Sequence, residues 1–191
     1  KQIRENSRNS IISAIDNGFP IELDIHFCQK NEFIVFHDDD LLRIFNLNVK
    51  TKDINPDFLN YLNYSKTDSS IMTLREALDL VNGRVPLLIE IKSARKDLKK
   101  ISNILVEQLS NYNGHYALQS FDPFLLKELR LVDQSVPVGW LCCNWWQQNI
   151  KLYEKLYLNF LGPYKSNLID FLSVEKNLLQ TKSIRFLRDY L

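Results

Sequence analysis

The chain has 191 residues, 45 % of them hydrophobic, which suits one domain with a substantial core and is short for two independent domains. Its 24 Lys and Arg residues nearly balance 23 Asp and Glu residues, and the net charge of +1 excludes the broad basic field typical of nucleic-acid binders. No apolar run approaches the roughly 20 residues that span a bilayer, so no transmembrane segment is predicted.

Cysteine usage favours a reducing compartment. The three cysteines are Cys28 and the adjacent pair Cys142 and Cys143, an odd number without the spacing of a disulfide framework or a zinc site. No segment with the character of a signal peptide opens the sequence. We therefore expect a cytoplasmic location. Because the sequence begins at Lys1 and not at Met, this expectation covers only the chain as given.

The first part of the chain reads as a helix, two strands and a long polar segment. A helix is predicted to begin at Asn6 or Ser7 and to stop at Gly18. Residues 38–70 contain few apolar runs and many Asn, Asp and Lys residues, so we expect an extended loop or a small insertion there. Loops of this length usually have a function. Between the helix and this segment, strands are predicted at 20–27 and 33–37.

From Thr73 onward, helices and strands alternate. Thr73 and Glu76 have the spacing of a capping box and predict the start of a helix. Asp97 is predicted to cap the next helix, and Asp122, which is followed by proline, to cap a third. The remaining predicted elements are strands at 86–92, 115–121, 136–141 and 168–174, and helices at 145–159 and 183–191.

This alternation predicts an α/β fold with parallel strands. Six strands are predicted, whereas a closed (β/α)8 barrel needs eight. Ionisable residues stand near the ends of several of these strands, which is where barrel enzymes build their sites. We therefore expect residues 1–191 to form a single TIM-type (β/α)8 barrel domain in which two of the eight strands are absent from the given sequence.

Three carboxylates are the main candidates for a metal site. Glu22 and Asp24 stand two residues apart on one strand, so their side chains point to the same face. Glu90 ends a strand that reads as buried, where a carboxylate is costly unless it is coordinated or paired. Carboxylates alone favour one hard cation, Mg²⁺ or Ca²⁺, over zinc. From the residues alone, a solvent-facing edge strand or an internal pair between Glu90 and Lys92 remains an alternative.

Four further residues complete the predicted site. His37 ends the second strand and is a candidate catalyst, the alternative being a histidine bonded to the loop at 38–40. Lys92 lies on the face of the third carboxylate and is a candidate for both catalysis and substrate binding. His26 shares the face of the first two acids and is expected to line the site, more as a support than as a catalyst. Gln119, near the end of its strand, is a candidate substrate contact.

The motifs together resemble a known family. Glu22-Leu-Asp24, Phe36-His-Asp38 and Glu90-Ile-Lys92, in this order and preceded by Glu5-Asn-Ser7, are similar to motifs of the glycerophosphodiester phosphodiesterase family. The resemblance extends to Gln119-Ser-Phe-Asp122 and the later strands. It implies a (β/α)8 barrel that uses a divalent cation to hydrolyse glycerophosphodiesters to an alcohol and glycerol 3-phosphate.

The resemblance also implies a role for each matching residue. Glu22, Asp24 and Glu90 match the metal-binding acids of the family, His37 matches one of its two catalytic histidines, and Lys92 matches a cationic residue near the substrate phosphate. In the reaction that the resemblance implies, the glycerol 2-hydroxyl attacks phosphorus and water opens the resulting cyclic phosphate. The two histidines exchange the protons.

One motif of the family has no counterpart in the sequence. The family's His-Arg-Gly would stand just before the Glu-Asn-Ser segment, and its last strand would lie beyond Leu191, so we expect the first and last barrel strands outside the chain. Two other functions stay open, namely a phospholipase of the same superfamily acting on intact lipid and a catalytically incomplete barrel that binds metal or phosphate. The preferred head group, the choice of cation and the oligomeric state are not determined.

Overall fold

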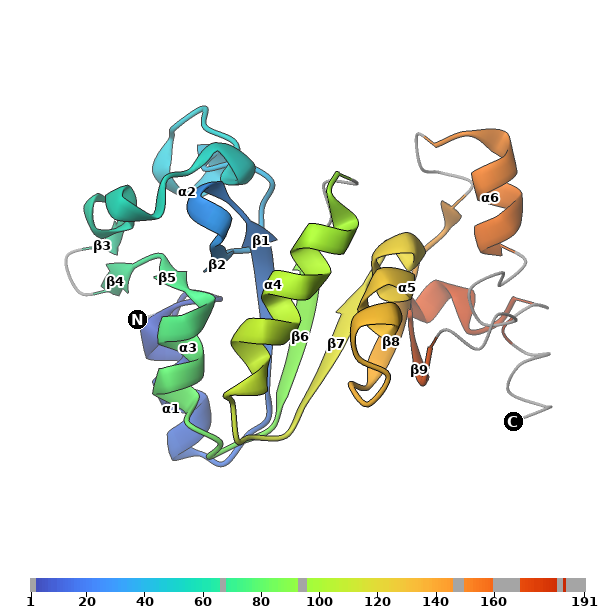
Figure 1. The fold of residues 1–191 in the computed structure, drawn as a ribbon. Helices are drawn as coiled ribbons and strands as arrows, with labels where there is room; N and C mark the ends of the chain where they lie inside the picture. Colours follow the sequence, from blue (N-terminus) through green and yellow to red (C-terminus); the bar gives the residue numbers. More distant parts are fainter. Residues whose placement is uncertain are drawn as a thin grey trace.

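A mostly parallel sheet with helices packed along it dominates the molecule (Figure 1). The structure is a computed structural model that describes residues 3–65, 68–92, 96–145, 150–159, 169–181 and 184. Within these residues the sheet has seven strands in the order β5-β2-β1-β6-β7-β8-β9. The strands that pair in parallel are β1 (Ile21–Phe27), β6 (Leu87–Lys92), β7 (Tyr116–Ser120), β8 (Val138–Cys142) and β9 (Phe171–Val174).

The strand predicted at 33–37 does not run parallel to its neighbour. It forms β2 (Phe33–Val35), which pairs antiparallel with β1 and, on its other side, with β5 (Met72–Thr73). Residues 28–32 connect β1 to β2 and hold only the short 3-10 turn η1 (Gln29–Asn31). A parallel crossover needs a dozen or more residues, so this connection can make only a hairpin. The expected six parallel strands are therefore five in the described part of the chain.

Three helix starts follow the predicted capping residues. Ser7 caps α1 (Arg8–Asp16), and Thr73 and Glu76 form the reciprocal capping box of α3 (Leu74–Val81). Asp122 accepts a hydrogen bond from the backbone of Phe124 at the start of α5 (Pro123–Val132). These local signals depend on residues a few positions apart, which is why the sequence is sufficient to predict them.

The predicted cap of α4 (Leu98–Ser110) is wrong. Asp97 precedes the helix, but its side chain makes no capping hydrogen bond. Its backbone is left-handed, with φ of 51°, whereas a capping side chain reaches the first turn from an extended backbone.

The C-terminal helices match their predictions only in part. The helix predicted at 145–159 is the shorter α6 (Leu152–Asn159), and residues 146–149 lie outside the described chain. The ring of Trp145 instead stacks on that of Trp140, with centroids 6.1 Å apart. The 3-10 turn η5 (Lys176–Leu178) follows β9, and the helix predicted at 183–191 falls outside the described residues except for Ile184.

The segment predicted as a loop or insertion at 38–70 contains short elements with a hydrophobic cluster of their own. Several of its apolar side chains pack with Cys28, which follows β1, and with Ile34 of β2 in a cluster separate from the main core. The elements of this segment are α2 (Leu42–Phe45), η2 (Thr51–Asp53), η3 (Pro56–Tyr61), β3 (Asn63–Ser65) and β4 (Asp68–Ser70). The cluster comprises Cys28, Ile34, Phe36, Leu41, Ile54, Leu59 and Ile71.

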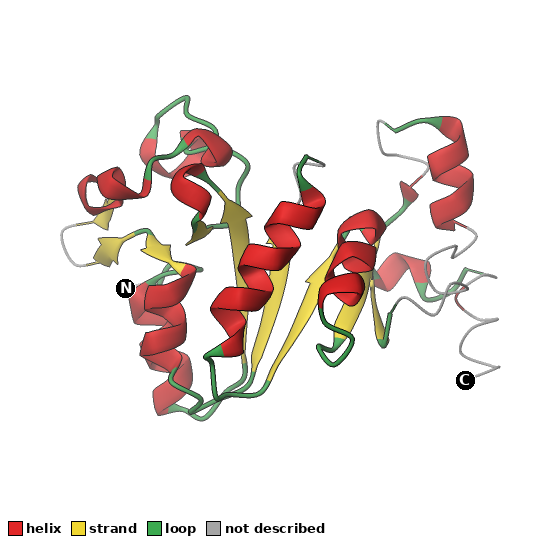
Figure 2. Ribbon diagram, in the orientation of Figure 1, coloured by secondary structure: helices red, strands yellow, loops and turns green. Residues whose placement is uncertain are grey.

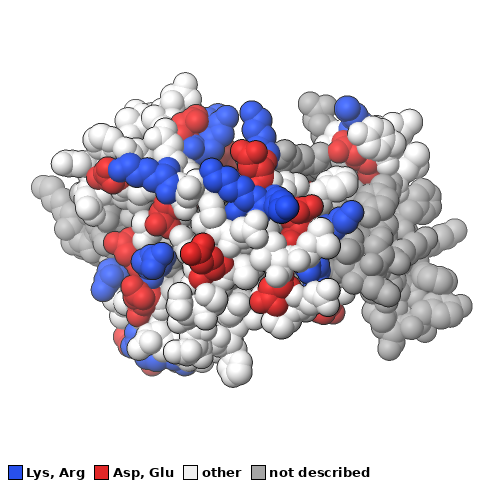
Figure 3. Space-filling model, in the orientation of Figure 1, with Lys and Arg blue, Asp and Glu red and all other residues white. Residues whose placement is uncertain are grey.

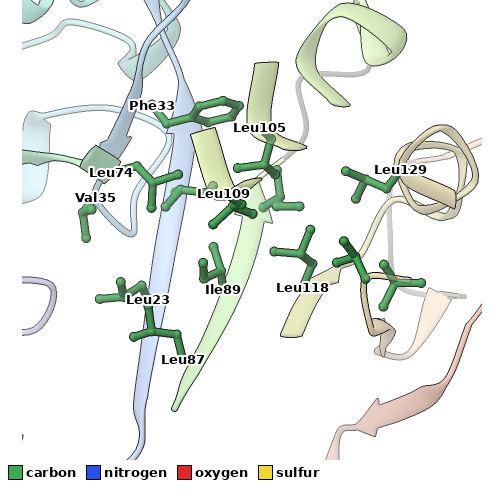
Figure 4. Packing of buried hydrophobic residues seen from close by; sticks show 14 of the residues in the cluster. Leu23, Phe33, Val35, Leu74, Leu87, Ile89, Leu105, Leu109, Leu118 and Leu129 are labelled. Atoms are coloured by element: carbon green, nitrogen blue, oxygen red, sulfur yellow. The ribbon is translucent and has the colours of Figure 1, made fainter. Parts of the chain in front are cut away.

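The main core lies between the sheet and the helices, which stand along one face of the parallel strands in Figure 2. Figure 4 shows the strand residues Leu23, Leu87, Ile89 and Leu118 with Leu105 and Leu109 of α4. Because strand residues alternate between faces, burying Leu23 and Ile89 against the helices turns Asp24 and Glu90 to the opposite face. No helix among the described residues combines the length and apolar character that crossing a bilayer requires.

Candidate active site

The register of the parallel strands sets the geometry of the site. β1 and β6 pair so that Asp24 lies beside Glu90 and His26 beside Lys92. β7 continues the row by placing Gln119 beside Glu90. Residues that are far apart in the sequence thus share one face toward the carboxyl ends of three adjacent strands, where parallel α/β proteins build their sites.

Three carboxylates meet at this face. Glu22, Asp24 and Glu90 each offer one carboxylate oxygen, and these oxygens lie within 4.8 Å of one another. Asp24 and Glu90 are buried, at 5 % and 8 % exposed, whereas Glu22 is partly open to solvent and only its inner side is covered by the cluster. Carboxylate oxygens this close repel each other unless a cation lies among them, and their hardness suits Mg²⁺ or Ca²⁺.

Lys92 supplies positive charge inside this cluster. Its ammonium lies 2.7 Å from Asp24 Oδ1 and 2.5 Å from Glu90 Oε1. The internal pair that the sequence left open for Glu90 is therefore present, and it includes Asp24 as well. Burial alone lowers the pKa of Lys92, but its hydrogen bonds to the two carboxylates outweigh burial and leave the pKa raised.

One lysine does not neutralise three acids. Burial, together with the negative charges of Asp24 and Glu90, raises the pKa of Glu22 to about 7. A carboxyl group with this pKa is partly protonated at neutral pH. The cluster therefore keeps an excess of negative charge that a divalent cation can offset, and its donor atoms fit such an ion.

Asn6 connects the segment before α1 to the carboxylate cluster through two hydrogen bonds to Asp24. Its side-chain amide donates to Asp24 Oδ2 at 2.8 Å, and its Oδ1 accepts the backbone N–H of Asp24 at 3.2 Å. Asn6 is buried and has a left-handed backbone, with φ of 53°, which Asn tolerates better than most residues. From the sequence, Asn6 is predicted only as a possible helix start. Its place in the Glu5-Asn-Ser7 motif is the signal that could have indicated a role at the site.

His37 belongs to a chain of charged groups. Its Nδ1 lies 2.8 Å from Asp38 Oδ1, and Arg43 of α2 donates to both oxygens of Asp38, at 2.6 Å and 2.9 Å. Arg43 also donates to Glu5 at 2.7 Å. The hydrogen bonds from Arg43 are the main reason that the pKa of Asp38 falls to about 2. Asp38 therefore stays ionised beside His37. The role of Arg43 had no signal in the local sequence, because it arises from contacts between three segments.

His26 supports the loop that carries His37. It is buried at 5 % exposed, and its Nε2 lies 3.2 Å from the carbonyl oxygen of His37. A carbonyl can only accept, so a hydrogen bond here places a proton on Nε2. Nδ1 lies 3.1 Å from the hydroxyl of Thr51, which donates to the carbonyl oxygen of Asp39 at 3.1 Å. Burial lowers the pKa of His26, in agreement with a neutral ring. These contacts join β1, the His37 loop and η2.

Gln119 lies beside the acidic cluster but outside it. It is 4 % exposed, and its Oε1 accepts a hydrogen bond from Ser173 of β9 at 2.9 Å. The structure thus brings together the predicted residues Glu22, Asp24, Glu90 and Lys92. His37, His26 and Gln119 stand around this group on adjacent elements.

Comparisons with known proteins agree with this geometry. The sequence pattern of the "Glycerophosphoryl diester phosphodiesterase family" matches residues 1–185. Protein MG293 of Mycoplasma genitalium, which is uncharacterized, is 29 % identical over 150 residues, which cover 72 % of this chain and 61 % of that protein. The chain therefore spans less than two thirds of that relative.

Solved structures share the fold. A phosphodiesterase of Oleispira antarctica, in complex with the product sn-glycerol-3-phosphate, has a TM-score of 0.77 at 17 % identity, over 97 % of this chain and 75 % of that one. The glycerophosphodiester phosphodiesterase of Thermotoga maritima has a TM-score of 0.74 at 24 % identity, over 98 % and 75 %. The fold is thus the TIM-type barrel of these enzymes, and the described strands form its mostly parallel sheet. Since the family pattern extends over nearly all of the sequence, the chain belongs to the glycerophosphoryl diester phosphodiesterase family.

Proposed function

We propose that the protein containing this chain hydrolyses glycerophosphodiesters to an alcohol and glycerol 3-phosphate with the help of a divalent cation. The observation that carries the proposal is the convergence of three carboxylates and Lys92 at the strand ends of a chain of this family. The product bound to the Oleispira antarctica phosphodiesterase supports the same reaction class. The substrate is a small molecule.

Glu22, Asp24 and Glu90 are the proposed ligands of one Mg²⁺ or Ca²⁺. The bound cation supplies Lewis acidity and neutralises charge on the phosphoryl oxygens. Lys92 adds an ammonium that can donate to an anionic oxygen of the phosphate, since it lies within hydrogen-bond reach of two of the three carboxylates.

His37 is the proposed acid and base. Asp38 accepts from Nδ1, which fixes the ring orientation and leaves Nε2 to exchange a proton with the reacting hydroxyl. His26 supports this arrangement by bonding the His37 carbonyl, and it is proposed to line the substrate site. Gln119 is proposed to contact the substrate through its amide, with its oxygen oriented by Ser173.

The proposal also covers the domain organisation and the cellular location of the protein. We propose that residues 1–191 are part of a single barrel domain, in which the segment at 38–70 is a small insertion beside the site. We also propose a cytoplasmic location, because all three cysteines are free thiols and two of them are buried.

A direct assay tests the function. Full-length protein is incubated with glycerophosphocholine and Mg²⁺ or Ca²⁺, and release of glycerol 3-phosphate is measured beside Glu90→Gln, which keeps the shape but removes the charge. Glu107→Gln, an exposed change on α4, is the matched control. We expect a cation-dependent activity that Glu90→Gln lowers at least about 100-fold and Glu107→Gln leaves intact. Equal activity with a chelator, or in Glu90→Gln, contradicts the metal assignment.

A further inference from the structure

The two carboxylate oxygens of Asp24 have different surroundings. Oδ1 lies 2.7 Å from the ammonium of Lys92, which also contacts Glu90, so this oxygen faces the carboxylate cluster. Oδ2 accepts a hydrogen bond from the side-chain amide of Asn6 at 2.8 Å, and both partners of this bond are buried. Asp24 therefore presents one oxygen to the cluster, while its other oxygen is already occupied.

A single planar group holds both the side chain and the backbone of Asp24. The amide nitrogen of Asn6 donates to Oδ2, and the amide oxygen accepts the backbone N–H of Asp24 at 3.2 Å. The carbonyl oxygen of Asp24 is held in turn by the backbone N–H of Phe36 at 2.9 Å. Asparagine suits this role because its amide combines donor and acceptor on one rigid plane. These bonds restrict the rotation of the Asp24 carboxylate.

The start of α1 fixes the position of Asn6. Ser7, the next residue, caps the helix, and its hydroxyl donates to the carbonyl oxygen of Arg4 at 2.7 Å. The turn is thus closed on both sides of Asn6, whose backbone is left-handed. The amide that holds Asp24 is therefore in place before any ligand binds, which is the condition for a preorganised site.

We propose that Asn6 is a positioning residue that keeps Asp24 as a one-oxygen ligand of the cation. The inference rests on the proposed function, because it concerns the cation of that same site. Mg²⁺ demands a nearly octahedral set of single oxygens, whereas Ca²⁺ accepts more ligands and carboxylates that bind through both oxygens. Without Asn6, Asp24 can rotate and offer both oxygens, which Ca²⁺ uses better. Asn6 thus shifts the selectivity of the site toward Mg²⁺.

Calorimetry of cation binding tests this role without any substrate. Asn6→Gly removes both hydrogen bonds and keeps the left-handed backbone free of strain. Asn82→Gly is the matched control, because Asn82 is also left-handed, with φ of 47°, but is exposed at the end of α3. The dissociation constants of Mg²⁺ and Ca²⁺ are measured for the full-length protein at about pH 8. We expect Asn6→Gly to raise the constant about 10-fold or more for Mg²⁺ and about 3-fold or less for Ca²⁺. Asn82→Gly should change neither.

A second variant covers the case in which Asn6→Gly does not fold, which urea unfolding of the metal-free protein detects. Asn6→Asp keeps an acceptor for the backbone N–H of Asp24 but lacks the donor to Oδ2, so it should lower the preference for Mg²⁺ in the same direction.

The outcomes separate this role from the metal site itself. On the face drawn in Figure 3, acidic side chains are interspersed with basic ones, so a tight cation-binding step is assigned to the buried cluster. Unchanged affinity for Mg²⁺ in the folded Asn6 variants overturns the positioning role. An equal loss for both cations also overturns it, since that is the effect of a merely structural residue. Absence of cation binding by the wild type contradicts the metal assignment of the proposed function.

Discussion

Lys92 occupies a position where its charge serves both stability and chemistry. Its ammonium is within hydrogen-bond distance of two buried carboxylates, and its own side chain is only 18 % exposed. Carboxylates buried without a partner are costly, so the lysine stabilises the metal-free protein. In the proposed site, the same ammonium would be available to a phosphate once a cation neutralised Asp24 and Glu90. Lys92 would therefore contribute to both folding and function.

Replacing Lys92 separates these contributions. Lys92→Met keeps the length of the side chain but leaves Asp24 and Glu90 without their cation, so we expect the metal-free protein to lose about 3 kcal/mol of unfolding free energy. Added Mg²⁺ or Ca²⁺ should return part of this loss. Urea unfolding with and without the cation measures both effects, and Lys127→Met is the exposed control. A variant as stable as wild type without metal would show that the pairing is unimportant.

Glu22 makes cation binding depend on pH. Its pKa is raised to about 7 by burial and by Asp24 and Glu90, whereas the unfolded carboxyl titrates near 4.5. A raised acid pKa means that the folded, metal-free protein holds this proton more tightly than the unfolded chain does. Its stabilising contribution is thus present below pH 4.5 and is lost as the pH rises toward 7.

The same proton competes with the cation. We expect the affinity for Mg²⁺ or Ca²⁺ to rise between pH 6 and pH 8, with release of a proton at pH 6 as the cation binds. Calorimetry at pH 6 in two buffers of different ionisation enthalpy counts the released protons. Glu22→Gln cannot release this proton, and it serves as the comparison. Identical proton release from wild type and variant would assign the proton to another group.

At the scale of elements, the short helix α2 reaches the site through Arg43. This residue binds both oxygens of Asp38 and also Glu5, so it connects α2, the loop after β2 and the segment before α1. Without Arg43, the charge of Asp38 would act on His37 alone. Asp38 would then lose the hydrogen bonds that fix its orientation toward His37 Nδ1.

Arg43→Gln should therefore slow the proposed reaction. We expect kcat to fall by about 10-fold, because Asp38 loses the two hydrogen bonds that orient it against His37 Nδ1. Arg43→Lys, which keeps the charge but loses the two-pronged contact, should recover part of the rate. The control is Arg75→Gln on α3. An unchanged kcat in Arg43→Gln would contradict this role of Arg43.

The sequence predicts the helix starts better than it predicts the direction of the strands or the contacts between distant segments. Capping at Ser7, Thr73 and Asp122 depends on neighbouring residues and is predicted correctly, whereas the direction of β2 depends on the length of its connection to β1. The alternation in β1 and β6 predicts that Glu22, Asp24 and Glu90 leave the core side of the sheet. The contacts of Arg43 could not be predicted, because they join segments distant in sequence, whereas Asn6 had a signal in the Glu5-Asn-Ser7 motif.

At the scale of the whole molecule, a balanced composition conceals an uneven distribution of charge. The net charge of +1 excludes a broad basic surface, yet the fold gathers three carboxylates in one cluster. Composition averages over the chain, whereas Asp24 and Glu90 meet only because β1 and β6 are neighbours in the sheet. Local fields of this kind act on substrates even when the total charge is near zero.

The metal site should also couple the two halves of the sheet. Its ligands come from β1 and β6, which the chain separates by the whole 38–70 segment and α3, so the unfolded chain cannot hold them together. A ligand that binds only the folded state stabilises it by about 2.7 kcal/mol at 100 times its dissociation constant. We therefore expect Mg²⁺ or Ca²⁺ to raise the unfolding midpoint of the full-length protein, and Glu90→Gln to abolish the increase.

Denaturant unfolding at several cation concentrations measures this coupling, with NaCl at equal ionic strength as the control for general screening. The dependence should follow the logarithm of cation concentration above the dissociation constant. Glu107→Gln, at an exposed position on α4 outside the cluster, should respond as wild type does. Equal stabilisation by NaCl, or an undiminished increase in Glu90→Gln, would place the cation elsewhere. Because this measurement needs no substrate, it tests the metal site independently of the reaction.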